Sequence, residues 1–129
     1  MTRENQEADN PSRRLRVILG TTAKRLPRVS VETLRTFHAY LVEHLPFPFE
    51  ARQSDPIGPH RDTKSPLKVI RLMDPIKDYA PEEMYGLICK ADQNGHRIEL
   101  PLDRIDVEES SPHYQLLEDY RHWLWNCSH

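Results

Sequence analysis

A stripe of apolar residues at helical spacing runs through the segment 30–45. It consists of Val31, Leu34, Phe37, Leu41 and Leu45. Ser30 is a favourable N-cap, and Thr33 occupies the position from which a side chain can return a bond to the cap. Pro46 ends the pattern, because proline lacks an amide hydrogen and disfavours helical geometry in the residue before it. The pattern predicts an N-terminal helix over about 30–45, with His38 beside the stripe as a partly buried structural histidine.

A second wide apolar face lies near the end of the chain. It consists of Leu116, Leu117, Tyr120, Trp123 and Leu124. Ser111 is placed to cap this helix, and Pro112 stands at the first helical position, where proline is well tolerated. Since Tyr120 and both tryptophans lie in this one helix, we expect much of the core to pack there.

Short apolar runs between the two helices predict antiparallel strands. The expected strands begin at Phe47 and cover 67–73, 84–91 and 96–102, with a fifth around 105–107. Asn94–Gly95 is the strongest short signal for a hairpin turn. We therefore expect an α+β fold: a small, strongly bent antiparallel sheet or barrel of four to five strands, flanked by an N-terminal and a C-terminal helix. Residues 30–129 are expected to form a single compact domain.

The segment Leu45–Arg52 reads LPFPFEAR and links the first helix to the first strand. In an extended chain Phe47 and Phe49 project to one side and Glu50 to the other. The prolines stiffen the exit from the helix, so we expect both aromatic rings to enter the core. Glu50 is then left on the opposite face or at the rim of the sheet.

The first 29 residues differ from the rest of the chain in charge. A basic block without any acidic residue inside it comprises Arg13, Arg14, Arg16, Lys24, Arg25 and Arg28. We expect residues 1–29 to be a disordered basic tail, with contact to nucleic acid or to an acidic surface as the alternative.

Composition limits the classes of function. The net charge of −2 gives no overall attraction to nucleic acid or membrane, and no apolar run has the length of a membrane span. Cys89 and Cys127 do not form a C-x-x-C pair, as is typical of a reduced, cytoplasmic protein. No nucleophile elbow, phosphate-binding loop or H-E-x-x-H motif is present, and the seven histidines show no ligand spacing. We therefore do not expect an enzyme.

Carboxylates are the more informative residues. The segment 103–109, DRIDVEE, carries four acidic residues, and further acids lie in the loops and the last helix. Calcium takes about six to eight oxygen ligands, chiefly carboxylates and carbonyls. An EF-hand is excluded: if Gly95 occupied its glycine position, Lys90 would be the first ligand and Pro101 the closing glutamate.

The order of several short motifs resembles the cyanobacterial calcium-binding protein family known as CcbP. The motifs are Phe47–Phe49 in YLVEHLPFPFEAR, Glu83–Met84 in PEEMYGLICKA, Leu100–Leu102 in IELPLDRIDV, and Asp119–Tyr120 with Trp123 in YQLLEDYRHWLWN, and SPLKVIRLM lies between the first two. The resemblance covers about residues 37–126. It implies a small protein that binds calcium through acidic residues outside any EF-hand, as a buffer or sensor. The basic N-terminal segment and the nearly neutral net charge depart from the acidic pattern of that family.

Two sets of calcium ligands follow as hypotheses. The first set gathers Glu50 and the acids after the P-L-D motif near the sheet rim: Glu50, Asp103, Asp106, Glu108 and Asp119. Asp74 and Asp78 form a second set. The competing hypothesis is a protein-interaction module without metal, which would use its loops and the basic segment to contact an unknown protein partner.

Overall fold

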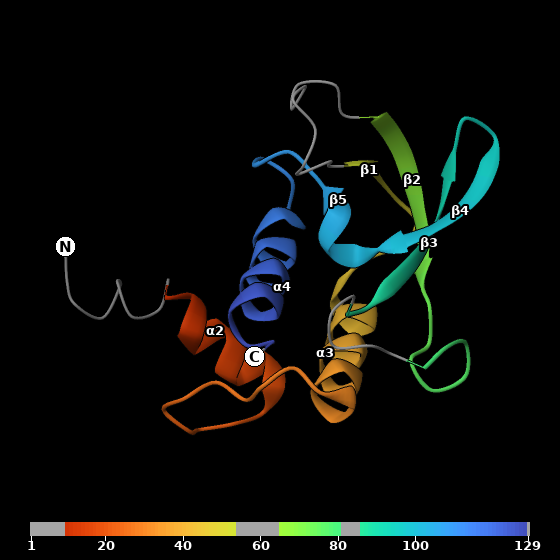
Figure 1. Cartoon of the computed structure of the whole chain (residues 1–129). Coiled ribbons are helices and arrows are strands. Elements are labelled where there is room, and N and C mark those ends of the chain that lie inside the picture. The colour runs from red at the N-terminus through yellow and green to blue at the C-terminus, as the bar shows by residue number, and fades with distance from the viewer. Residues whose placement is uncertain (1–9, 54–64, 81–85, 129) are drawn as a thin grey trace.

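The computed structural model describes residues 10–53, 65–80 and 86–128, and these residues form an α+β fold, as expected. Figure 1 shows the helices gathered on one side of a curved sheet. The helices are α2 (Pro11–Leu19), α3 (Val31–His44) and α4 (Tyr114–Asn126), and a short 3-10 turn, η1, covers Leu102–Arg104. The strands are β1 (Phe49–Gln53), β2 (Ser65–Leu72), β3 (Ile88–Gln93), β4 (His96–Pro101) and β5 (Ile105–Asp106).

The five strands make one antiparallel sheet in the order β4-β3-β2-β1-β5. In the described residues β4 and β5 each pair with a single strand, so the sheet is open and the barrel alternative is wrong. The predicted hairpin turn is confirmed: Asn94 and Gly95 have φ of 52° and 81°, and Gln93 pairs with His96. Two successive positive φ values match the right-handed twist of the flanking strands.

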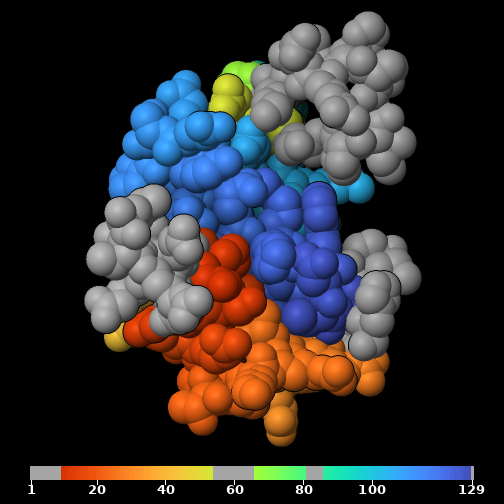
Figure 2. Space-filling model, turned by 90° about the vertical axis from the view of Figure 1, so that its left-hand side faces the viewer, coloured from red at the N-terminus to blue at the C-terminus, as the bar shows by residue number. Residues whose placement is uncertain are grey.

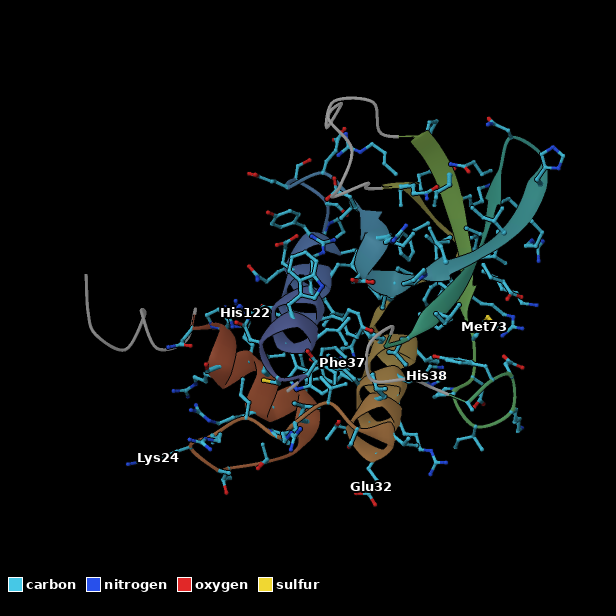
Figure 3. All side chains as sticks on the ribbon, in the orientation of Figure 1. Lys24, Glu32, Phe37, His38, Met73 and His122 are labelled. Atoms are coloured by element: carbon cyan, nitrogen blue, oxygen red, sulfur yellow. The ribbon has the colours of Figure 1, made fainter. Side chains whose placement is uncertain are left out.

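Helix α3 forms as its apolar stripe predicts. Ser30 and Thr33 bond reciprocally: Thr33 N donates to Ser30 Oγ at 3.2 Å and Ser30 N donates to Thr33 Oγ1 at 2.8 Å. Phe37 is fully buried in the space between α3 and α4 (Figure 3), where its ring stacks on Trp123 with centroids 5.1 Å apart. His38 is half-buried on the same helix.

Helix α4 begins later than the sequence suggests. His113, not Ser111, occupies the N-cap position, and the helix runs from Tyr114. Ser111 Oγ instead accepts a bond from His113 N at 3.2 Å, so it stabilises the turn before the helix. The predicted apolar face is buried at Leu117, Tyr120, Trp123 and Leu124. Trp125 remains 54% exposed, so only one of the two tryptophans enters the core.

The segment after α3 places its side chains as expected. The rings of Phe47 and Phe49 lie 5.5 Å apart between centroids, and Phe49 is buried. Glu50, the next residue, is exposed on the opposite face of β1. The alternation of side chains along a strand therefore decides where this carboxylate points.

Residues 10–29 are not a disordered tail, and that expectation is wrong for this part of the segment; residues 1–9 lie outside the described residues. Asn10 caps α2 by accepting a bond from Ser12 N at 2.8 Å, and Gly20 ends the helix in the left-handed conformation. Leu15 and Ile18 are three positions apart, so both face the protein, and both are buried. Figure 2 shows α2 (red) lying directly against α4 (blue).

Polar contacts also fix the chain that follows α2. Trp123 Nε1 donates to the carbonyl of Pro27 at 3.0 Å, and Val29 N donates to the carbonyl of Cys127 at 2.8 Å. Arg16 donates to the carbonyls of Ala23 and Lys24. The basic residues between 13 and 28 therefore lie on a helix and on a loop that hydrogen bonds hold in place.

Candidate metal centre

The seven acids predicted as calcium ligands occupy several separate places in the structure. In the part of the chain that the structure describes, no three or more His, Cys, Asp or Glu side chains form a group that could hold a metal ion. The first predicted set is therefore not brought together as one site. The contacts of each acid show what its carboxylate does instead.

Glu50 belongs to a row of alternating charges on the outer face of the sheet. Its cross-strand neighbour is Lys68 on β2, whose Nζ is 3.9 Å from Glu50 Oε1. Lys68 is paired in turn with Asp92 on β3, and Asp92 with Arg97 on β4. Opposite charges on cross-strand neighbours stabilise a sheet modestly. Glu50, whose side chain is 79% exposed, is the acidic end of this row.

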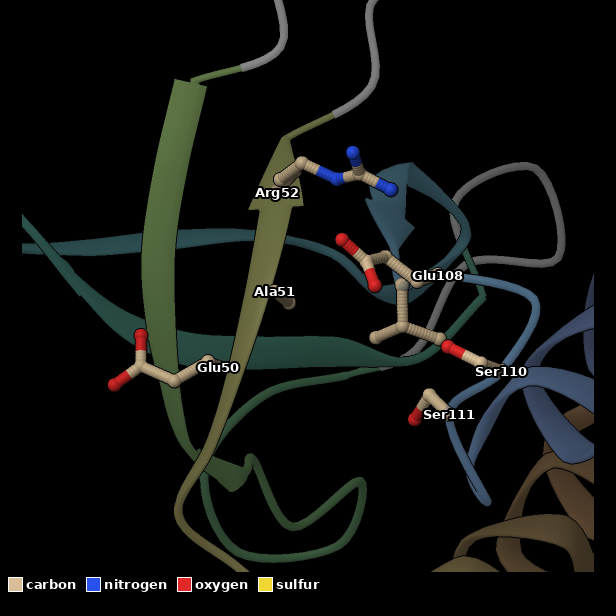
Figure 4. A pocket seen from close by; sticks show the side chains of 7 residues that line it. Glu50, Ala51, Arg52, Glu108, Ser110 and Ser111 are labelled. Atoms are coloured by element: carbon tan, nitrogen blue, oxygen red, sulfur yellow. The ribbon is translucent and has the colours of Figure 1, made fainter.

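Asp106 and Glu108 lie beside Arg52 at the other side of β1. Asp106 Oδ2 is 3.7 Å from Arg52 Nη2, so this carboxylate already has a cationic partner. Glu108 lines a shallow pocket of about 300 Å³ together with Ser110 and Ser111. Figure 4 shows the carboxylate of Glu108 directed toward the Arg52 side of the pocket, whereas that of Glu50 points away on the other side of β1. Glu50 and Glu108 therefore border one pocket without converging.

Asp103 helps to hold the η1 turn against α4. Its Oδ2 accepts a bond from Trp125 Nε1 at 3.1 Å. Arg121 donates to the carbonyls of Asp103 and Ile105, at 3.2 and 2.6 Å, and is also bonded to Glu118. These contacts give Asp103 a structural role.

Among the described residues, Asp119 is the carboxylate that is buried. Its partners are charged and polar side chains of the protein. Arg14 Nε donates to Oδ2 at 2.7 Å and Arg14 Nη2 to Oδ1 at 3.0 Å. Gln115 Nε2 donates to Oδ1 at 2.9 Å. Two-point binding by a guanidinium is a strong form of ion pair. Asp119 therefore joins α4 to α2, and a calcium ion would have to replace Arg14 to reach it.

Asp74 and Asp78 are the predicted ligands that the structure does bring together. They lie in the loop after β2, where Asp78 Oδ2 accepts a bond from Asp74 N at 2.8 Å. Asp74 Oδ1 accepts bonds from the backbone N–H groups of Ile76 and Lys77, at 2.7 and 3.2 Å. Arg71 Nη1 donates to Asp78 Oδ2 at 2.9 Å. The turn thus holds two carboxylates side by side.

The same contacts keep both carboxylates charged. The backbone N–H of Ile76 is the largest cause that lowers the pKa of Asp74, and the N–H of Asp74 followed by Arg71 lowers the pKa of Asp78. Every hydrogen bond seen to these carboxylates uses Asp74 Oδ1 or Asp78 Oδ2. Among the described residues, Asp74 Oδ2 and Asp78 Oδ1 thus keep their lone pairs for another ligand. The sequence signal for this pair is the short segment 74–78, DPIKD, which is short enough to place both aspartates on one turn.

His38 faces this loop from α3 (Figure 3). Burial lowers the pKa of His38, and the negative charges of Asp74 and Asp78 partly oppose that effect. The glutamate–methionine motif at Glu83–Met84, and the loop acids Asp55 and Asp62, lie outside the described residues.

A protein-family model matches most of the chain. The model of the CcbP calcium-binding family, described as calcium binding, matches residues 29–124 of the chain. This range begins before α3 and ends within α4, so it includes the whole sheet and leaves out α2. No curated protein and no solved structure matched the chain. Among the described residues, none of the helices has the length and apolar character needed to cross a membrane.

Proposed function

Because the chain belongs to the CcbP family of calcium-binding proteins, we propose that it binds calcium, and that it does so with oxygen ligands outside an EF-hand. The observation that carries this function is the extent of the family match, which covers the five strands and two of the three described helices. The resemblance in the FPF and P-L-D motifs supports the same function.

Asp74 and Asp78 are the charged ligands that the structure favours. They stand on one turn, their pKa values are lowered, and each carboxylate keeps one oxygen outside the hydrogen bonds of the turn. The described residues do not complete a calcium site by themselves, because calcium needs about six to eight oxygens. Asp74 and Asp78 are thus the acidic part of the proposed site.

Competition from basic residues decides between the candidate places. Asp119 is held at two points by Arg14, so calcium would have to displace that arginine to reach it. Asp106 also has a cationic partner, Arg52, whose Nη2 is 3.7 Å away. Asp74 is bonded to backbone N–H groups, which carry no full charge. Asp78 does pair with Arg71, in an exposed position where solvent weakens the attraction. We expect Arg71→Gln to raise calcium affinity if Asp78 is a ligand.

Thermal unfolding of the full chain in chelator, in calcium and in magnesium tests the function and the ligands together. Calcium at about 100 times its dissociation constant should stabilise the folded state by about 2.7 kcal/mol, which raises Tm by several degrees. The double variant Asp74→Asn with Asp78→Asn should lose this rise. A matched control, Asp103→Asn with Asp106→Asn, removes the same charge elsewhere and should keep it.

The two outcomes that contradict the proposal are different and can be told apart. A calcium-specific rise that survives in the Asp74/Asp78 double variant would reject the ligands and keep the function. No calcium-specific rise in the wild-type chain would reject the function itself.

A further inference from the structure

Strand β4 is an open edge of the sheet. In the described residues it pairs with β3 on one side and with no strand on the other. Figure 1 shows the β3–β4 hairpin projecting on the side of the sheet away from the helices. An open edge carries unpaired N–H and C=O groups, which can join another strand. The backbone and side-chain groups that face outward along β4 therefore determine which strand can pair with it.

The hairpin register determines the direction of those groups. Gln93 and His96 close the two-residue turn, and pairs that bond to each other alternate with pairs that do not along an antiparallel ladder. Ile98 consequently directs its N–H and C=O toward β3, and Arg97 and Glu99 direct theirs outward. Pro101 lies in the same outward series, so its missing N–H costs β4 no bond to β3.

The two outward residues carry opposite charges and are well exposed. The side chains of Arg97 and Glu99 are 56% and 55% exposed. Within the hairpin Arg97 Nε is 2.5 Å from Asp92 Oδ1, and Lys90 Nζ is 3.8 Å from Glu99 Oε2. One residue, Ile98, separates the positive from the negative position. A second β4 strand running antiparallel about Ile98 would therefore place Arg97 opposite Glu99 of the second copy, and Glu99 opposite Arg97 of that copy.

The rows on both faces of the sheet continue through such a pairing. On the charged face, the existing series Lys68, Asp92, Arg97 would be followed by Glu99 and Lys90 of the second copy, so that charges alternate in sign across the junction. On the other face, the apolar row Val69, Ala91, Ile98 ends at the edge, where Ile98 is only half-buried. Pairing would bring the two Ile98 side chains together on that face.

We propose that β4 is a self-association edge, at which two copies of this chain pair antiparallel about Ile98 and form one continuous sheet. Arg97 and Glu99 supply the hydrogen-bonding backbone groups and the charge complementarity. The occupant is a second copy because the edge is complementary to itself under a two-fold rotation, as a symmetric dimer requires. A single strand pair buries little area, so the dimer is a weak one that forms at high protein concentration.

Charge reversal at the edge tests this pairing in the full chain. Sedimentation equilibrium over a concentration series, in chelator, should show a monomer–dimer equilibrium for the wild type. Arg97→Glu alone, and Glu99→Arg alone, should each weaken association on the order of tenfold to a hundredfold, because like charges then face each other across the junction. The combined variant should associate as the wild type does. An equimolar mixture of the two single variants should also dimerise, and more tightly than either variant alone.

Two further variants separate the edge from other causes. Glu99→Pro removes an outward N–H without removing a bond to β3, and it should abolish dimerisation while circular dichroism remains native. Arg35→Glu changes an exposed charge on α3 and should leave dimerisation unchanged. A wild-type chain that stays monomeric throughout the series would overturn the proposal. Dimerisation that persists equally in both single reversals would overturn it as well.

Discussion

The ion pair between Arg14 and Asp119 offers a sharp test of how the N-terminal segment is held. The side chain of Asp119 is 4% exposed and that of Arg14 is 26% exposed. Replacing Arg14 by Met keeps most of the side-chain volume. Among the described residues it leaves Gln115 as the side chain that donates a hydrogen bond to the Asp119 carboxylate. Breaking a buried pair in this way costs about 3–5 kcal/mol.

Partial exposure of Arg14 lowers that figure, since water can reach the site once the guanidinium is gone. We expect Arg14→Met to reduce the free energy of unfolding by about 2–3 kcal/mol. Because a domain of this kind is stable by only about 5–15 kcal/mol, the loss is large enough to measure. Urea unfolding followed by tryptophan fluorescence is a suitable assay, because buried Trp123 lies on the same helix as Asp119.

A second substitution distinguishes an uncompensated charge from lost packing. Adding Asp119→Leu to Arg14→Met removes the buried charge, so the double variant should be more stable than Arg14→Met alone. If Arg14→Met stayed within about 0.5 kcal/mol of the wild type, the pair would not hold α2 in place. A double variant whose loss equals the sum of the two single losses would contradict the charge argument.

Two smaller predictions concern the core and the loop after β2. Tyr120→Phe should cost about 1–3 kcal/mol, because Leu87 N donates to Tyr120 Oη at 2.7 Å inside the core and would lose its acceptor; urea unfolding measures this, and an unchanged midpoint would contradict it. His38 has a pKa lowered chiefly by burial, so the unfolded chain takes up its proton more readily than the folded one. Its contribution to stability is thus complete above about pH 6.5 and is lost as the pH falls toward the lowered pKa. His38→Gln should therefore reduce the loss of stability between about pH 7.5 and about pH 5.5, and an equal loss in both proteins would refute the assignment.

Much of the fold follows from local sequence signals. The apolar stripe and the Ser30–Thr33 pair specify α3, and Asn94–Gly95 specifies the hairpin, because each signal acts within a few residues. The apolar face of α4 is also a local signal, because its residues recur at helical spacing. The start of α4 is not specified in this way, because Ser111 and Pro112 suit a helix start and a preceding turn equally well.

Helix α2 was missed because its stabilising contacts are distant in the sequence. The segment PSRRLRVIL has the charge of a solvated tail, and its buried residues are just Leu15 and Ile18. Its ion-pair partner, Asp119, is 105 positions away. Two predicted metal ligands likewise have partners that local sequence does not reveal, because Asp106 pairs with Arg52 and Asp119 with Arg14, which belong to other elements. Asp74 and Asp78 share one turn, so their proximity could be predicted locally.

Calorimetric titration with calcium is the decisive experiment, because it measures the binding itself. The full chain, freed of metal with a chelator, would be titrated with calcium and then, in a separate sample, with magnesium. Calcium should give saturable heat with a defined stoichiometry. This heat should be reduced in the Asp74→Asn, Asp78→Asn variant, and magnesium should not reproduce it. Absence of saturable calcium binding in the wild-type chain would contradict the account, whatever its fold and family.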